Sequence, residues 1–149
     1  MERLNVRVKK LDKNAVVPKI ATEFSAGADL YACSGGKDIE INSGETVFVH
    51  TGLAMEIPVG YVGLVYARSG LASKKGLAPA NKVGVVDSDY RGEIMVAIHN
   101  HSGEKQVLAD KERIAQIVLT PYLVADYEEC EELSETARGS GGFGSTGNK

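Results

Sequence analysis

The sequence contains few cysteines, few aromatic residues and no long apolar run. Its 149 residues include 2 Cys, no Trp and only 6% aromatic residues. No apolar run approaches the ~20 residues that a transmembrane helix needs, and the first eight residues lack the apolar core of a secretory signal. We therefore expect a cytoplasmic protein without a membrane partner, in which Cys33 and Cys130 are reduced and structural.

An excess of positive charge is also missing. The formal net charge is -3, with 17 Lys and Arg against 20 Asp and Glu. A nucleic-acid groove or an anionic membrane surface requires a large cationic field, so neither is expected as the main partner. A small polyanionic ligand is still compatible with a local cluster of basic residues.

What the sequence does contain is a succession of short apolar runs separated by turn residues. Hydrophobic residues make up 43% and charged residues 25%, as is ordinary for a single soluble domain. One short helix is expected at Ser69–Lys75, with Ser69 as its N-cap and Gly76 as its stop. Strands are expected at residues 3–11, 29–32, 39–41, 46–50, 53–57, 61–67, 94–101, 106–108 and 113–124. This pattern indicates an all-β fold of the sandwich or jelly-roll type.

The composition changes near the C-terminus. We expect a jelly-roll domain at residues 1–127, followed at 128–149 by an acidic linker and a glycine-rich tail. The tail matches the dinucleotide fingerprint G-x-G-x-x-G formally, but no strand and helix surround it. A flexible end is the simpler interpretation. The alternative is that exposed amides beside Arg138 wrap phosphate oxygens, while Phe143 stacks on a flat ring.

Residues 81–94 are expected to form a β-hairpin whose turn is rich in polar residues. Val85 and Val86 run directly into Asp87, and Tyr90 follows before the apolar pattern resumes. An ordinary surface turn is the simpler interpretation, because Asp, Ser and Gly all favour turns. A second hairpin is expected at residues 101–103.

Other polar residues suggest anion binding. Arg68-Ser69-Gly70 lies where a strand gives way to the helix, a position suited to an anion or to an ordinary cap. Arg113 and Gln116 lie within an apolar strand, where polar side chains need either a structural partner or a ligand.

Two carboxylates, Asp29 and Asp87, each lie at the mouth of a strand. One could orient a water for attack and the other could lie in the outer shell of a divalent cation, although each alone is more often a turn residue. His99 and His101 share one face of a strand, but no third ligand lies at the right spacing, so zinc is not expected.

Five segments, taken together and in order, resemble the five motifs of the trimeric dUTP pyrophosphatases (dUTPases). They are residues 26–30 (AGADL), 67–71 (ARSGL), 84–92 (GVVDSDYRG), 113–116 (RIAQ) and 138–147 (RGSGGFGSTG). The resemblance implies a dUTPase-like jelly roll of the β-clip type, assembled as a homotrimer with active sites at the subunit interfaces. It also implies Mg2+-assisted hydrolysis of dUTP to dUMP and pyrophosphate, which keeps uracil out of DNA and supplies dUMP for thymidylate synthesis.

The same resemblance assigns roles to individual residues. It makes Asp87 the general base that orients a water towards the α-phosphorus, places Tyr90 under the deoxyribose, and lets Asp29 reach Mg2+ through water. The implied substrate-binding set is Arg68, Ser69, Gly70 and Gln116 at the phosphates, Asn81, Gly84, Val85, Val86 and Met95 in the nucleoside pocket, and Arg138, Phe143, Gly144, Ser145 and Thr146 from the tail. Asp89 and Arg91 receive no ligand role and are expected to stabilise the turn or a subunit contact.

Two alternatives accompany this interpretation. One is a dCTP deaminase of the same fold, which usually relies on a Glu base, whereas here Asp87 and Tyr90 are intact. The other is a non-catalytic jelly-roll binding module. Ala67 and Val86 depart from the family's frequent Pro and Ile, but neither position carries a polar role.

Overall fold

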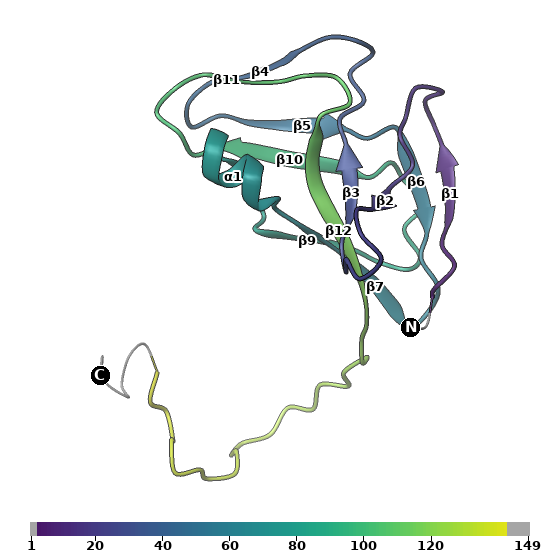
Figure 1. Cartoon of the computed structure of the whole chain (residues 1–149). Coiled ribbons are helices and arrows are strands. Elements are labelled where there is room, and N and C mark those ends of the chain that lie inside the picture. Colours follow the sequence, from purple (N-terminus) through teal and green to yellow (C-terminus); the bar gives the residue numbers. More distant parts are fainter. Residues whose placement is uncertain (1–2, 143–149) are drawn as a thin grey trace.

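The computed structural model describes residues 3–142. Within this range the chain forms twelve strands and one short helix, in the order shown in Figure 1. The strands are β1 Arg7–Lys10, β2 Lys19–Ile20, β3 Ala28–Tyr31, β4 Ile39–Ile41, β5 Thr46–His50, β6 Leu53–Glu56, β7 Tyr61–Tyr66, β8 Leu77–Pro79, β9 Val83–Val86, β10 Met95–Asn100, β11 Gln106–Leu108 and β12 Arg113–Pro121. The helix α1 spans Ser69–Lys75. The all-β jelly-roll expectation is confirmed, and none of the described helical segments is long and apolar enough to cross a membrane.

The largest sheet has five strands in the order β2-β3-β12-β7-β9. Its centre is β12, which pairs antiparallel with β3 on one side and β7 on the other. Ile114, Ala115 and Ile117 of β12 are buried, as expected of a β-branched apolar strand at the middle of a sheet. Gln116 is the polar exception, and it lies opposite both Asp29 of β3 and Tyr66 of β7.

Three smaller sheets complete the fold, with the orders β5-β10-β8, β1-β6 and β11-β4. In β10 the inward residues Val96, Ile98 and Asn100 are buried, while the alternate residues face outward. One hydrophobic cluster joins the sheets, so the described body has a single core.

The helix has the predicted bounds but a different N-terminal cap. Arg68 occupies the cap position in an extended conformation, and no side chain caps the helix. The prediction of Ser69 as N-cap was therefore wrong by one residue. Gly76 ends the helix as expected, in the left-handed conformation with φ of 64°.

Both predicted hairpins were wrong in their strand pairing. β9 pairs with β7, whereas β10 pairs with β5 and β8, so residues 81–94 cross from one sheet to another. β11 likewise pairs with β4 and not with β10. The opening strand is also shorter than predicted, because only Arg7–Lys10 finds a partner, in β6. Turn residues indicate where the chain bends, but the partner of each strand depends on segments far away in the sequence.

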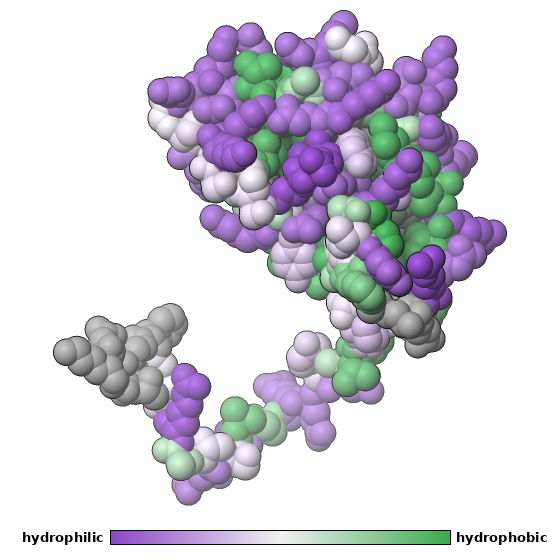
Figure 2. Space-filling view, in the orientation of Figure 1, coloured by the Kyte–Doolittle hydropathy of each residue, from purple (hydrophilic) through white to green (hydrophobic). Residues whose placement is uncertain are grey.

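Beyond Pro121 the chain leaves the body as an extended segment (Figure 1). The strand predicted at residues 113–124 therefore ends three residues early. Figure 2 shows hydrophobic residues along this segment, and Leu123 and Tyr127 are each 96% exposed. Both cysteines are free, but Cys130 is exposed, so its predicted structural role was wrong.

Candidate active site

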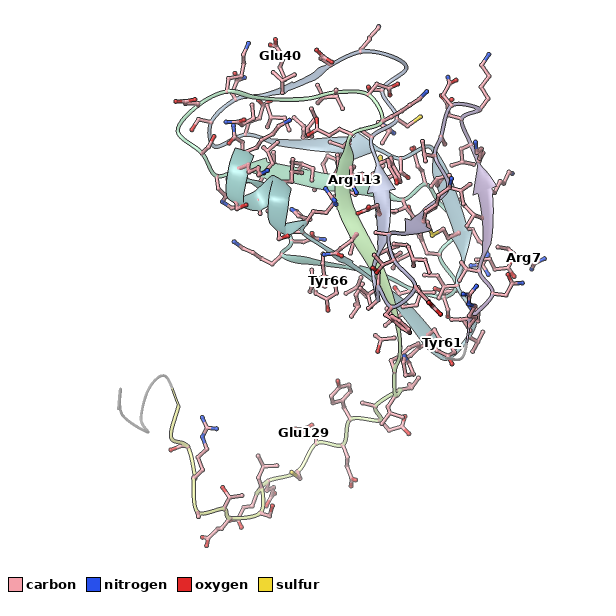
Figure 3. All side chains as sticks on the ribbon, viewed as in Figure 1. Arg7, Glu40, Tyr61, Tyr66, Arg113 and Glu129 are labelled. Atoms are coloured by element: carbon pink, nitrogen blue, oxygen red, sulfur yellow. The ribbon has the colours of Figure 1, made fainter. Side chains whose placement is uncertain are left out.

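Four predicted functional side chains meet at one end of the five-stranded sheet. Asp29 comes from β3, Arg68 from the junction of β7 and α1, and Arg113 and Gln116 from β12. Their convergence follows from strand register, since Gln116 lies opposite Asp29 on one side and Tyr66 on the other. With Ser69 they line a cavity of about 390 Å3, which we call the anion cavity. Figure 3 labels Arg113 where β12 passes β3.

Asp29 organises the charges of the anion cavity. One carboxylate oxygen accepts a hydrogen bond from Arg68 Nε at 2.7 Å, and the other accepts from an Arg113 guanidinium nitrogen at 3.2 Å. The Asp29 side chain is 13% exposed, against 25% for Arg68 and 50% for Arg113. Two cations thus share one anion, which leaves the group with net positive charge and a preference for an anionic ligand.

Several residues that line the anion cavity were not in the predicted substrate-binding set, among them Arg113 and Gly27. Arg113 was expected to meet either a structural partner or a ligand, and its contact with Asp29 supplies the structural partner. Gly27 lines the cavity, and a Cβ there would lie 2.5 Å from Gln116 Oε1. The side-chain amide of Gln116 is oriented by its hydrogen bond from Nε2 to the Ala67 carbonyl at 3.0 Å. Because Gly27 has no side chain, it leaves room for this amide.

The second group of predicted residues lies on β9 and on the segments directly before and after it. The Val83 N–H donates to the Asn81 carbonyl at 2.7 Å, and Lys82 between them has a positive φ of 65°. A Cβ on Gly84 would lie 3.2 Å from Asn81 Nδ2 and 3.3 Å from the Cβ of Val65. Gly84 therefore lets the Asn81 amide lie close over the start of β9.

Asp87 follows β9 directly and opens a turn that closes at Tyr90, whose N–H donates to the Asp87 carbonyl at 3.2 Å. Among the residues that the structure describes, no hydrogen bond or ion pair engages the exposed Asp87 carboxylate, which can therefore accept a proton from water. Arg91 donates to the Ser88 and Tyr90 carbonyls at 2.6 and 3.0 Å. These hydrogen bonds agree with the turn-stabilising alternative for Arg91 and leave the subunit contact untested.

Asp87 and the anion cavity lie towards opposite ends of the sheet. Val83 of β9 pairs with Tyr66 of β7, next to the anion cavity, whereas Val86 pairs with Gly63. Asp87 lies four residues beyond Val83, about 13 Å along the strand direction. Figure 3 labels Tyr66 and Tyr61, the residues at the two ends of β7. A single subunit does not bring Asp87 to the anion cavity.

The remaining predicted residues are dispersed or outside the described range. Met95 begins β10, opposite His50, and is 43% exposed. Gly70 is exposed in the first turn of α1. Arg138 lies in a turn at residues 137–140 and donates from Nε to the Gly141 carbonyl at 2.8 Å. Phe143, Gly144, Ser145 and Thr146 lie outside the described residues.

The described residues contain no group of three or more His, Cys, Asp or Glu side chains that could hold a metal ion. His99 and His101 instead contact each other, with ring centroids 4.4 Å apart. Desolvation lowers the pKa of His101, and the neighbouring His99 and Lys82 lower it further. This pair is therefore a contact between two histidines at the C-terminal end of β10.

Comparisons with known proteins agree with one another. A family model described as dUTPase matches residues 13–147. A deoxyuridine 5'-triphosphate nucleotidohydrolase of Desulfitobacterium hafniense is 49% identical over 146 residues, covering 97% of this chain and 96% of the relative. A mutant dUTPase of Staphylococcus bacteriophage 80alpha, solved with dUpNHpp, is 28% identical with a TM-score of 0.86, covering 96% of this chain and 98% of the other.

A further solved structure, a mutant dUTPase from phage phi11 of S. aureus, reveals the coordination of a structural Mg(II) ion in that protein. It is 24% identical with a TM-score of 0.77 and covers 87% of this chain and 98% of the other. At this identity the likeness concerns the fold alone.

Proposed function

The chain belongs to the dUTPase family, and we propose that it acts through active sites that neighbouring subunits of a homotrimer complete. Its reaction is the hydrolysis of dUTP to dUMP and pyrophosphate. The match over residues 13–147 carries this assignment, because it includes all five motifs. In addition, a relative that is 49% identical over nearly the whole chain bears the same activity in its name. The deaminase and the binding module are therefore not favoured.

The separation of Asp87 from the anion cavity supports the shared site. Asp87 and the anion cavity are about 13 Å apart along one sheet, too far for one carboxylate to orient a water at a phosphorus held by Arg68. A closed symmetric assembly can bring the Asp87 turn of one copy to the anion cavity of another, and repeats the same site in each copy. A homotrimer satisfies this requirement with three equivalent sites.

Asp87 is the general base of the proposed mechanism. Its carboxylate takes a proton from water as the water oxygen bonds to the α-phosphorus, and the bond from that phosphorus to its bridging oxygen breaks. Pyrophosphate then leaves with the electron pair of the broken bond. The exposure of Asp87 suits this role, because water reaches the carboxylate without displacing a protein partner.

The β9 segment selects the nucleoside. Asn81 and the backbone from Gly84 through Val85 and Val86 read the uracil edge and the 3'-hydroxyl. Tyr90 lies under the deoxyribose and leaves no room for a 2'-hydroxyl, with Met95 nearby in the substrate pocket. A rigid backbone at this point can exclude a base with a 5-methyl group because that group does not fit. It can exclude a base with a 4-amino group because a polar atom is then left without a hydrogen-bond partner.

The anion cavity binds the phosphates through Arg68, Ser69, Gly70 and Gln116. Mg2+ bound with the triphosphate would supply charge neutralisation at the phosphate oxygens. Asp29 fits an outer-shell role towards that ion, because its two oxygens already accept from guanidinium groups and, among the described residues, it is the only carboxylate that lines the cavity. A cation that keeps most of its water and phosphate ligands suits a site with one carboxylate.

The tail completes the site in this proposal. Arg138, Ser145 and Thr146 hold the γ-phosphate, while Gly144 allows close backbone approach and Phe143 covers the uracil ring. Residues 128–149 thus form a closing segment attached to the jelly roll at 1–127. We place the reaction in the cytoplasm, where thiols such as those of Cys33 and Cys130 stay reduced.

Subunit complementation tests the shared site. Asp87→Asn and Arg68→Ala are each expected to abolish most turnover of dUTP when expressed alone. Co-expressed in equal amounts, they should regain about a quarter of wild-type activity, because random assembly unites intact Asp87 with intact Arg68 in that fraction of sites. No recovery in mixed trimers would place the whole site within one subunit.

Pyrophosphate release from dUTP, dTTP, dCTP and UTP tests the substrate choice. Only dUTP is expected to be turned over efficiently. Release of ammonia from dCTP would support the deaminase instead. Equal absence of turnover in the wild type and Asp87→Asn would support the binding module.

A further inference from the structure

The ring of Tyr90 has little direct support from the core. The side chain is 44% exposed. Its hydroxyl donates to the backbone carbonyl of Glu93 at 2.9 Å, which anchors the far end of the ring. The orientation of Tyr90 therefore depends on where the peptide group of Glu93 lies.

Gly92 leaves the space into which the ring of Tyr90 folds. A Cβ at Gly92 would lie 2.4 Å from the Tyr90 hydroxyl oxygen and 2.6 Å from Cζ, far inside an ordinary contact. The ring thus lies across its own loop, between a glycine and the carbonyl that follows it. This geometry holds only while the loop keeps its position.

The side chain of Glu93 ties the loop to the connection between β5 and β6. Its Oε1 accepts the N–H of Gly52 at 2.8 Å, and its Oε2 lies 2.9 Å from His50 Nδ1. The Glu93 side chain is only 23% exposed. No other side chain of the turn at residues 87–93 makes a hydrogen bond outside the turn, among the residues described.

Gly52 is a rigid anchor for this contact. It has a φ of +68°, and a Cβ there would lie 2.9 Å from the Cβ of Ala15 and 3.1 Å from the Cys33 sulfur. Its carbonyl accepts the N–H of Leu11 at 2.8 Å. The Glu93 carboxylate therefore binds a backbone amide that packing on several sides holds in place.

We propose that Glu93 is a positioning residue for Tyr90, and through Tyr90 for the rejection of ribonucleotides. This inference rests on the sugar-contacting role given to Tyr90 under the proposed function. The carboxylate holds the loop against Gly52 and His50, the Glu93 carbonyl then fixes the Tyr90 hydroxyl, and Gly92 lets the ring lie flat in that position.

Glu112 offers a matched control for a purely structural carboxylate. It also accepts one backbone N–H, from Ala109 at 3.0 Å, and pairs with one basic side chain, Lys75 at 2.8 Å. Its side chain is 27% exposed, close to the value for Glu93. Glu93→Ala and Glu112→Ala should therefore lower the melting temperature by similar amounts.

The deciding measurement is the ratio of kcat/KM for dUTP to that for UTP. Glu93→Ala is expected to lower this ratio roughly tenfold, because the peptide group that accepts from Tyr90 is then held only through the Ile94 N–H, which donates to the Leu53 carbonyl at 2.8 Å. Glu93→Gln should stay within about twofold of the wild type, since its amide oxygen still accepts the Gly52 N–H. Glu112→Ala should leave the ratio unchanged. A wild-type ratio in Glu93→Ala, or an equal drop in Glu112→Ala, would overturn the proposal.

Two further variants separate this inference from the role of Tyr90 itself. Gly92→Ala should lower the ratio by displacing the ring while Glu93 keeps its contacts, and it should have no added effect in a Tyr90→Ala background. A reduced ratio in Tyr90→Ala together with an unchanged ratio in Glu93→Ala would refute the positioning role alone. An unchanged ratio in Tyr90→Ala would remove the sugar-contacting role, and the inference with it.

Discussion

Replacing Asp29 by Asn should lower the free energy of unfolding and at the same time strengthen the binding of anions in the anion cavity. The substitution keeps the shape of the side chain but removes the charge that Arg68 and Arg113 share. The contact with Arg68 is part-buried and charge-assisted, worth about 1.5–3 kcal/mol. The contact with Arg113 involves a half-exposed side chain and is worth about 0.2–1 kcal/mol after solvent screening.

These contributions together predict a loss of about 2–4 kcal/mol in the free energy of unfolding. For a domain of this size the melting temperature should fall by roughly 4–16 °C at fixed protein concentration. In the variant both guanidinium groups lack a counter-charge, so inorganic pyrophosphate should bind more tightly in the anion cavity. Ligand binding to the folded state raises the melting temperature, and the rise should be larger in Asp29→Asn than in the wild type.

Calorimetry with and without pyrophosphate, in a metal-free buffer, measures both effects. Glu40→Gln is a suitable control, because the ion pair of Glu40 with Lys105 at 3.0 Å has side chains 63% and 51% exposed (Figure 3). An exposed pair of this kind should contribute less than about 1 kcal/mol. If Asp29→Asn melts like Glu40→Gln, or gains no more from pyrophosphate than the wild type, the charge balance derived for the anion cavity is incorrect.

Three other substitutions or deletions have definite expected outcomes. Asp87→Asn should lower kcat for pyrophosphate release by about 10²–10⁴, with little change in melting temperature, because it removes the exposed carboxylate that we propose as general base. Deleting residues 138–149 should leave the fold and the assembly state unchanged by circular dichroism and gel filtration, yet remove most turnover of dUTP. The Ser34 N–H donates to Asp110 at 2.8 Å and lowers the pKa of that carboxyl below its ordinary value of 3.8. Asp110 therefore stabilises the fold above pH 3.8, and this contribution is lost as the pH falls through the lower native pKa. Asp110→Asn should accordingly lower the unfolding free energy at neutral pH, and its deficit relative to the wild type should shrink in acid.

Local sequence rules predicted the elements of the fold well. The bounds of α1 and of β4, β5 and β11 agree with the structure, because a left-handed glycine, a turn or a β-branched run acts on residues only a few positions away. The N-cap was misplaced by one residue, since Arg68 takes the cap conformation without offering a capping side chain. The motif residues were also recognisable from the sequence, because their chemistry depends on residue type and spacing.

Strand partners and site geometry could not be predicted in this way. The hairpin expected at residues 81–94 is absent because β9 and β10 find better partners in β7, β5 and β8, which lie many residues away. The same holds for Arg113, which meets Asp29 only because β12 pairs with β3 across 84 positions.

The sequence by itself therefore determined the composition of the proposed site: a carboxylate at Asp87, a tyrosine three residues later, and arginines and amides suited to phosphates. Only the tertiary structure decided that Asp29 is shared by two arginines, that Glu93 holds the Tyr90 loop, and that Asp87 lies far from the anion cavity of its own subunit. The physical reason is that residue chemistry is local, whereas distances across a sheet are set by the order and register of strands distant in the chain.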